Sequence, residues 1–372
     1  MNSGCFAISR ENQRGKRNSA SKKTLRSMAV SAAVLIGILV AGSMARADDL
    51  FIGDVHDNSV KQFDSTTGNL IDTFFVQPGA GGLNGPMGMI FTDGQLLVSN
   101  QNFGSAAGEV LRFNGQDGTF MNKLFSSTDR DAAYAPQGIV RGAPDNRYYV
   151  ADVGTQGGKC NSQGDVKLYD DAGAFLGNLD RTGFKPNFYP RGVVFGPDGL
   201  LYVSARGCPI SNSPNEALVA YVLRFDPYSR KFLNVFASDK TVAGFHRPEG
   251  LVFDDQRNLW ITSFRDAGDP NDVDRILKLD GKTGKLLDSI PLWAAGGTRH
   301  YAQAILFGPD GKLFIPVISG VPPAATTGKV LRCDTGTKQC DTIVQEGSTS
   351  LTYPWFLIFR KSDPATLRYN SN

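Results

Sequence analysis

The stretch Pro190-Arg191-Gly192-Val193-Val194-Phe195-Gly196-Pro197-Asp198-Gly199-Leu200-Leu201-Tyr202-Val203 decides the fold. A Pro-x-Gly step opens a short apolar strand, a Gly-Pro-Asp-Gly turn follows, and a second apolar strand comes directly after the turn. Proline fixes φ at one position of such a turn, and glycine permits positive φ at another. The stretch therefore predicts two short strands joined by a tight turn.

The same step returns six times along the chain. Its third positions are residues 88, 138, 192, 250, 304 and 356, so the intervals are 50, 54, 58, 54 and 52 residues. Each unit continues with a third strand that ends near an Asp, as at 222–226, and with a Gly-containing turn into a fourth strand. Four short antiparallel strands in about fifty residues are typical of a propeller blade.

The two ends of the repeat region complement each other. Residues 50–53 form a second strand that has no first strand before it, whereas 355–359 form a first strand without a complete blade after it. Pairing these segments completes one blade and removes the open sheet edges of an unclosed array. The sequence therefore predicts an all-β domain over residues 48–372: a single six-bladed β-propeller of four-stranded antiparallel blades, closed by pairing the C-terminal strand with the N-terminal blade.

Residues 1–47 have the features of a signal peptide. A basic stretch at 22–26 precedes the apolar run 28–40, and Ala45 and Ala47 form a small-x-small cleavage pattern before Asp48. A retained membrane anchor is the alternative, but the run is short for a span. We expect the mature chain to be periplasmic or secreted, without a membrane span, and monomeric.

Charge and composition narrow the classes of partner. The formal net charge is +3, but residues 1–47 hold eight Lys/Arg and one acid, and the remainder has 31 basic and 35 acidic residues. A mildly acidic body without a basic run lacks the charge pattern that phosphate backbones require. We therefore expect no nucleic-acid partner.

Four cysteines remain after the predicted cleavage, and export permits disulfides. Cys333 and Cys340 bracket a hairpin-sized loop, which favours their pairing and leaves Cys160 with Cys208. Four cysteines allow three connectivities, so this pairing is a preference. A metal–thiolate site is the rival, but no C-x-x-C spacing supports it.

The repeat units resemble known propeller families. The Pro-x-Gly step, the Gly-Pro-Asp-Gly turn, the Leu-Tyr/Trp-Val/Ile strand and the later Asp-x-x-Thr-Gly are similar to NHL repeats and to gluconolactonase/regucalcin-like propellers, and more loosely to virginiamycin B lyase. The resemblance covers roughly residues 50–360. It implies the fold, whereas the activity stays open, because this architecture hosts lactonases, lyases and non-catalytic binders.

The central channel is where we expect a site. The first strand of each blade lines the channel, so the middle residue of each Pro-x-Gly step should point toward its mouth. These residues are Met87, Gln137, Arg191, Glu249, Gln303 and Trp355. The ends of second strands reach the same face and add Asn100 and Asp152 as ligand-binding candidates. We expect Arg191 to anchor an anion and Glu249 to act as a ligand or general base; the alternative is that the two charges only neutralise each other.

A divalent metal, zinc or calcium, is a further hypothesis. His56, His246 and His300 are expected on one face of three neighbouring blades, and three imidazoles with an open position are typical of zinc sites. The peptidyl-hydroxyglycine amidating lyase, which has a comparable propeller, resembles this arrangement; a solvated rim is the alternative. The gluconolactonase-like resemblance implies metal-binding roles for Glu249, Asn100 and Asp152, although the closing blade has Trp355 where that family has an acid. The acid-rich loop 266–274 is a weaker candidate for calcium, with a solvated loop as the alternative.

Two functions follow from these features. The first is an exported propeller that binds a small polar ligand at the channel mouth, as a metal-assisted hydrolase of the lactonase type or a lyase. The second is a non-catalytic NHL-type propeller that holds an exported protein or a glycan. The first requires Glu249, His246 and His300 to converge within a few ångströms.

Overall fold

A computed structural model describes residues 48–360, except 105–106, 143–145, 156–161, 209–217, 267, 295–296, 298, 320–326 and 348–350. The predicted signal peptide lies outside the described residues. Within the described part of the chain, no helix is long and apolar enough to cross a membrane.

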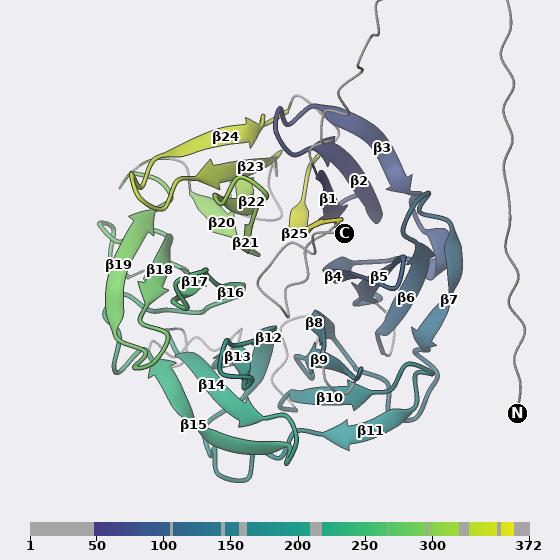
Figure 1. The fold of residues 1–372 in the computed structure, drawn as a ribbon, viewed down its shortest axis with the longest axis horizontal. Helices are drawn as coiled ribbons and strands as arrows, with labels where there is room; N and C mark the ends of the chain where they lie inside the picture. The colour runs from purple at the N-terminus through teal and green to yellow at the C-terminus, as the bar shows by residue number, and fades with distance from the viewer. Residues whose placement is uncertain are drawn as a thin grey trace, which may run out of the picture. The chain divides into compact units, whose positions relative to one another are not determined.

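The described chain forms six antiparallel sheets arranged as blades around a centre (Figure 1). The blades are numbered here in chain order, and the strand bounds are as follows. Blade 1 has β25 (Pro354–Phe359), β1 (Asp49–Asp54), β2 (Ser59–Asp64) and β3 (Leu70–Val76), with a 3₁₀ turn η1 (Ala80–Gly82) after it; blade 2 has β4 (Pro86–Thr92), β5 (Gln95–Asn100), β6 (Glu109–Asn114) and β7 (Phe120–Phe125); blade 3 has β8 (Pro136–Arg141), β9 (Tyr148–Asp152), β10 (Asp165–Tyr169) and β11 (Phe175–Asn178). Blade 4 has β12 (Tyr189–Phe195), β13 (Leu201–Arg206), β14 (Ala220–Asp226) and β15 (Lys231–Ser238); blade 5 has β16 (Leu251–Phe253), β17 (Leu259–Ser263), β18 (Arg275–Leu279) and β19 (Leu286–Pro291); blade 6 has β20 (His300–Ala302), β21 (Leu306–Phe307), β22 (Leu313–Ser319), β23 (Thr327–Cys333) and β24 (Cys340–Val344).

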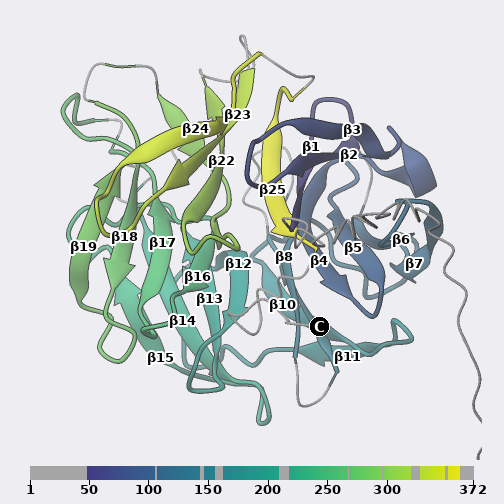
Figure 2. The same ribbon diagram turned by 45° about the horizontal axis from the view of Figure 1, so that its top comes forward.

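Ring closure takes place in blade 1, and the prediction for it is confirmed. The strand order of this sheet is β25-β1-β2-β3, so the last strand of the chain pairs with the first (Figure 2). Leu50 pairs with Phe359 and Ile52 with Leu357 in an antiparallel register. Strand β1 therefore has a hydrogen-bonded neighbour on both sides, as the second strands β5, β9, β13 and β17 of other blades have.

The core lies between neighbouring blades. Strands close to the axis are buried along most of their length, as in β5 and β9, whereas the outer strands β3, β7 and β19 begin with exposed residues. Large aromatic side chains fill the space between blades, and Tyr202 of blade 4 packs edge-on against Phe253 of blade 5. Burial of these faces supplies the main favourable free energy of folding.

Glycines at the third position of the repeated step let the first strands approach one another. A Cβ on Gly88 would lie 2.3 Å from the carbonyl oxygen of Gln137, and a Cβ on Gly138 would lie 2.7 Å from that of Arg191. Both distances are shorter than van der Waals contact. The glycines are thus required where backbones crowd the axis, as the sequence indicates.

Blade 6 departs from the regular pattern, because its first strand is divided into β20 and β21, both paired with β22. The interruption lies at the degenerate step Ala302-Gln303-Ala304, opposite Pro316 of β22. Proline has no N–H to donate to a neighbouring strand, so the ladder breaks there.

The disulfide between Cys333 and Cys340 is confirmed, and it joins directly opposed residues of β23 and β24. Cys208 is also disulfide-bonded. Cys160 lies outside the described residues, and its pairing with Cys208 stays a prediction.

Candidate functional site

A pocket lies at the mouth of the channel. Residues of the first strands, or residues adjacent to these strands, line it. It encloses about 250 Å³, open solvent included, and its walls come from all six blades. The lining residues are Met87, Gly88, Gln137, Gly138, Arg191, Gly192, Glu249, Gly250, Gln303, Trp355 and Phe356. All six middle residues of the Pro-x-Gly steps are among them. Their chemical role stays a prediction, but the repeat places them around one small space.

An ionic triad occupies one wall of this pocket. Arg191 Nε lies 3.9 Å from Glu249 Oε2, and Arg206 forms an ion pair with Glu249 Oε1. Arg206 Nε also donates a hydrogen bond to the carbonyl oxygen of Pro248 at 3.1 Å. The side chains of Arg191, Arg206 and Glu249 are 10%, 12% and 5% exposed. One buried carboxylate thus lies between two buried guanidinium groups.

Burial perturbs both guanidinium groups. It lowers the pKa of Arg191 to about 10, so Arg191 remains a cation at neutral pH. The pKa of Arg206 falls well below its ordinary value, first because of burial and then because of repulsion from Arg191, Arg247 and Arg299. The Nε of Arg191 is buried and makes no hydrogen bond to any described residue. The pocket therefore presents a cation with unused donor capacity.

The opposite wall is aromatic. Trp355 of blade 1 donates its Nε1 hydrogen to Gln137 Oε1 of blade 3 at 3.3 Å, and its ring stacks on Tyr353 with centroids 5.9 Å apart. The indole is thereby held in one orientation across the mouth. A flat apolar surface facing a guanidinium and a carboxylate suits a small polar molecule with an apolar face.

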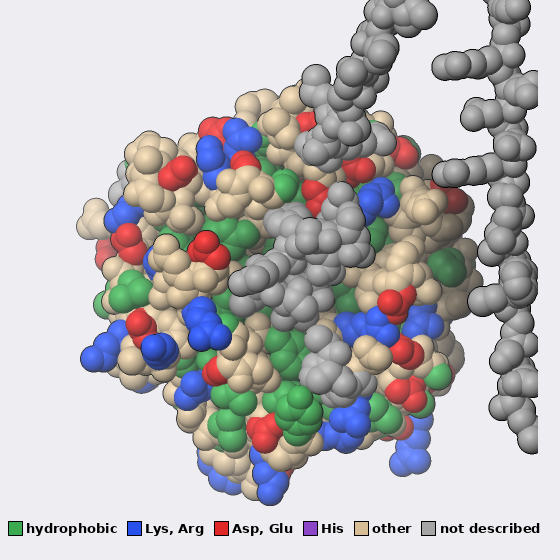
Figure 3. All heavy atoms as spheres, in the orientation of Figure 1, with side chains coloured by type: hydrophobic (Ala, Val, Ile, Leu, Met, Phe, Trp, Pro, Cys, Tyr) green, Lys and Arg blue, Asp and Glu red, His purple; other side chains and the backbone are tan. Residues whose placement is uncertain are grey.

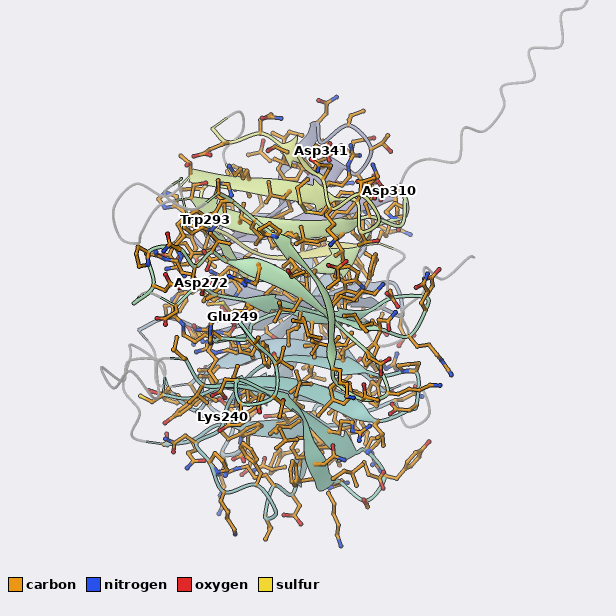
Figure 4. All side chains as sticks on the ribbon, turned by 90° about the vertical axis from the view of Figure 1, so that its left-hand side faces the viewer. Lys240, Glu249, Asp272, Trp293, Asp310 and Asp341 are labelled. Atoms are coloured by element: carbon orange, nitrogen blue, oxygen red, sulfur yellow. A yellow bond between two sulfur atoms is a disulfide. The ribbon has the colours of Figure 1, made fainter. Side chains whose placement is uncertain are left out.

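Glu249 lies on one side of the molecule. Figure 4 shows Glu249, Asp272 and Trp293 toward one side of the ring, whereas Asp310, in the turn between β21 and β22, lies toward the other. The segments that lead into first strands and those that leave second strands meet on the side of Glu249, because Tyr189 pairs with Arg206 at the start of β12. This agrees with the placement that the repeat predicts.

Asn100 and Asp152 lie at the ends of second strands but not in the pocket. Asn100 Oδ1 accepts the backbone N–H of Asn84 at 2.7 Å, and the Asp152 carboxylate accepts those of Tyr134 and Ala135 at 2.9 and 2.8 Å. Both side chains are buried. They hold the segments that enter the first strands of their own blades, and these hydrogen bonds use the oxygens that a ligand would need.

The three histidines do not gather into a metal-binding group. No cluster of three or more His, Cys, Asp or Glu that could hold a metal occurs among the described residues, which include all three imidazoles. His300 Nδ1 lies 3.1 Å from the carbonyl oxygen of Leu292, and the backbone N–H of His246 donates to Ser263 Oγ. The convergence of His246 and His300 with Glu249 that a metal-assisted reaction requires is therefore not found.

The acid-rich loop 266–274 is used in structural contacts. Asp272 forms an ion pair with Arg275, and Asp274 forms one with Arg299 at 2.8 Å. Asp274 is fully buried. The sequence predicts a solvated loop or a calcium site here. Asp274 lies two positions before the buried Ile276, and this period of two is the sequence signal for its burial.

His300 allows a test of this part of the structure by pH. Burial is the largest influence on its imidazole and lowers its pKa below 6.5, with repulsion from Lys329 second. Because the unfolded chain then binds the proton more tightly, stability should fall as the pH drops from about 6.5 through the lower pKa of the folded protein. NMR titration of the His300 ring protons should show a midpoint below 6.5, and His300→Gln should weaken this pH dependence. A midpoint above 6.5 would contradict the burial of His300.

The comparisons with known proteins agree with the fold. No protein-family model and no curated protein matches the sequence. Among solved structures, the periplasmic gluconolactonase of Pseudomonas aeruginosa matches with a TM-score of 0.51 at 16% identity, over 84% of this chain and 98% of that one. A luciferin-regenerating enzyme matches with a TM-score of 0.50 at 12% identity, over 83% of this chain and 92% of that one. The likeness is one of fold. It confirms the predicted resemblance to gluconolactonase-like propellers at that level.

Proposed function

We propose that the protein is an exported propeller that binds a small polar ligand in the channel-mouth pocket. The observation that carries this proposal is the convergence of Gln137, Arg191, Glu249 and Gln303 with Trp355 around one pocket. Ligand sites are concave and combine an apolar wall with a few placed polar groups.

Hydrolysis of a lactone is the reaction that we propose for this pocket. Water attacks the carbonyl carbon, the ring C–O bond breaks, and the ring oxygen leaves as a hydroxyl after taking a proton, which gives a hydroxy acid. Arg191, a buried cation with an unused donor, would stabilise the oxyanion of the tetrahedral intermediate. Glu249 would accept the proton of the attacking water. Gln137 and Gln303 would orient the ligand.

A divalent metal is not part of this proposal. Calcium takes six to eight oxygen ligands and zinc takes three or four nitrogen, sulfur or oxygen ligands. The pocket lining contains one carboxylate, that of Glu249, and it contacts Arg191 and Arg206. These residues do not fit a metal site, and no step of the proposed reaction runs through one.

The alternative function is a non-catalytic propeller that holds a ligand, a protein or a glycan. The ionic triad supports it, because Glu249 between two guanidinium groups neutralises buried charge whether or not it does chemistry. The two functions differ in turnover. A binder retains the polar molecule unchanged, and an enzyme converts it.

Lactone opening followed in a pH-stat, with calorimetric binding of the corresponding hydroxy acid, would test both functions on the mature protein. Glu249→Gln should lower kcat by about 10²-fold or more, since a general base contributes 10²–10⁴-fold, and Arg191→Gln should weaken binding of the hydroxy acid. Asp310→Asn, on the other side of the ring, is the matched control and should change neither kcat nor the affinity for the hydroxy acid. Binding without turnover would favour the non-catalytic function. Neither binding nor turnover across a panel of lactones and hydroxy acids would overturn the proposal.

A further inference from the structure

Arginines crowd around one aromatic ring beside the pocket. The guanidinium carbons of Arg206, Arg247 and Arg299 lie 4.8, 5.8 and 5.7 Å from the ring centroid of Phe264. Arg265, the next residue, lies 5.9 Å from the ring of Trp293. We call Arg206, Arg247, Arg265 and Arg299 the arginine cluster. It is formed by four separate segments of blades 4, 5 and 6.

The carboxylates near the arginine cluster do not balance its charge. Asp274 binds Arg299 through two hydrogen bonds, of 2.8 Å to Nε and 2.9 Å to Nη2, and Glu249 pairs with Arg206 and Arg191. No ion pair of Arg247 or Arg265 with a carboxylate is present among the described residues. Five guanidinium groups, Arg191 included, therefore share two paired carboxylates, with Asp266 as a further acid that acts on Arg247 without an ion pair.

Arg247 and Arg265 also have unused donors. The Nε atoms of both are buried and make no hydrogen bond within the described part of the chain. Arg247 Nη2 donates to the carbonyl oxygen of Arg265 at 2.8 Å, which orients the Arg247 fork. A buried polar group without a partner costs free energy, and for a charged group the cost is larger.

Repulsion within the cluster adds to this cost. Burial and then repulsion from Arg299 lower the pKa of Arg247, although Asp274 opposes the shift. Like charges held close together in a partly desolvated place are stabilised by an ion of opposite sign. Arg247 and Arg265 are partly exposed as residues, so an oxyanion that contacts their guanidinium groups would reduce the repulsion.

We propose that the arginine cluster is an oxyanion-binding site for the phosphate or carboxylate group of a small molecule. Guanidinium forks match these groups through paired hydrogen bonds, and the surrounding rings of Phe264 and Trp293 exclude water from the contact. On the face drawn in Figure 3, basic and acidic side chains are interspersed. The site does not depend on lactone hydrolysis, but Arg206 connects it to Glu249, so one ligand can reach both.

Isothermal titration calorimetry with inorganic phosphate and with citrate tests the site directly. The mature protein is titrated at neutral pH and low salt, and potassium chloride of equal ionic strength measures the unspecific effect of salt. We expect saturable binding of one equivalent, weakened at least tenfold in Arg247→Gln and in Arg265→Gln. Arg247→Lys retains the charge without the planar fork, so its affinity for the anions should lie between those of the wild type and Arg247→Gln. Arg130→Gln removes the same charge from an exposed loop of another blade and should bind as the wild type does.

Each outcome decides the proposal. Tighter binding of phosphate than of citrate identifies a phosphate ester as the ligand class, and the reverse order identifies a carboxylate. Equal weakening in Arg130→Gln and Arg247→Gln would overturn the proposal, because it would show attraction by net charge alone. No saturable binding of either anion would also overturn it, and this result is independent of any lactonase assay. Variants are compared only after their far-UV circular dichroism and thermal midpoints show that they fold.

Discussion

Asp274→Asn is expected to destabilise the protein by about 3–5 kcal/mol, the range for breaking a buried ion pair from one side. Asp274 is fully buried, and its two oxygens accept four hydrogen bonds. The donors are Arg299 Nε and Nη2, Trp293 Nε1 and the backbone N–H of Arg265. An asparagine would turn an NH₂ group toward some of these donors and leave the buried charge of Arg299 without a counterion.

Urea unfolding of the wild type and of Asp274→Asn measures this loss. Asp269→Asn is the matched control, because Asp269 lies in the same loop with an exposed side chain, and its carboxylate accepts the backbone N–H of Asn271. The control should differ from the wild type by less than about 0.5 kcal/mol. A urea midpoint for Asp274→Asn equal to that of the wild type would show that the stability of the arginine cluster does not depend on this carboxylate.

Asp54→Asn should also destabilise the protein, by about 1–3 kcal/mol, because Asp54 ties the closing strand to the first one and the change leaves buried N–H groups without an acceptor. Its carboxylate accepts the backbone N–H groups of Thr352 and Tyr353 at 2.8 and 2.9 Å, just before β25. Lys61 lies 3.6 Å away, and both side chains are fully buried. The substitution removes one of two carboxylates beside Lys61, which also pairs with Asp57, and weakens the junction of the two chain ends.

Equilibrium unfolding with a second probe distinguishes this effect from general destabilisation. Tyr353 and Trp355 stack beside the junction, so Trp355 fluorescence should report its opening. Asp72→Asn, on the exposed part of β3, is the control and should change the free energy of unfolding by less than about 0.5 kcal/mol. An unchanged midpoint in Asp54→Asn would mean that the strand pairing alone closes the ring.

The fold and the inner ring of the pocket could be predicted from the sequence, because both follow from a period. The Pro-x-Gly step marks the start of each first strand, so one alignment of the repeat identifies Met87, Arg191 and Trp355 as equivalent residues. Ring symmetry then brings equivalent positions to one axis. Closure could be predicted for the same reason, since the two incomplete units add up to one blade.

The arginine cluster could be predicted only in part. Arg206 and Arg265 lie at or after the ends of second strands, which the repeat places on the face of the channel mouth. Arg247 and Arg299 precede first strands at non-equivalent positions, and only the packing around Phe264 brings them to Arg206. The role of Asp152 was missed for another reason. A polar residue after a second strand can face a ligand or hold a neighbouring backbone segment, and residue type does not separate these uses.

The closing strand has a consequence for the order of assembly. Blades 2 to 6 are each built from one continuous piece of chain, whereas blade 1 needs β1 at the beginning and β25 near the end. The pairing of Leu50 with Phe359 closes a loop that contains all of blades 2 to 6. During synthesis, the edge of β1 therefore stays open until residues 354–359 have left the ribosome. A nascent or truncated chain that lacks β25 exposes that edge to other chains, so the last strand made is the one that protects the first.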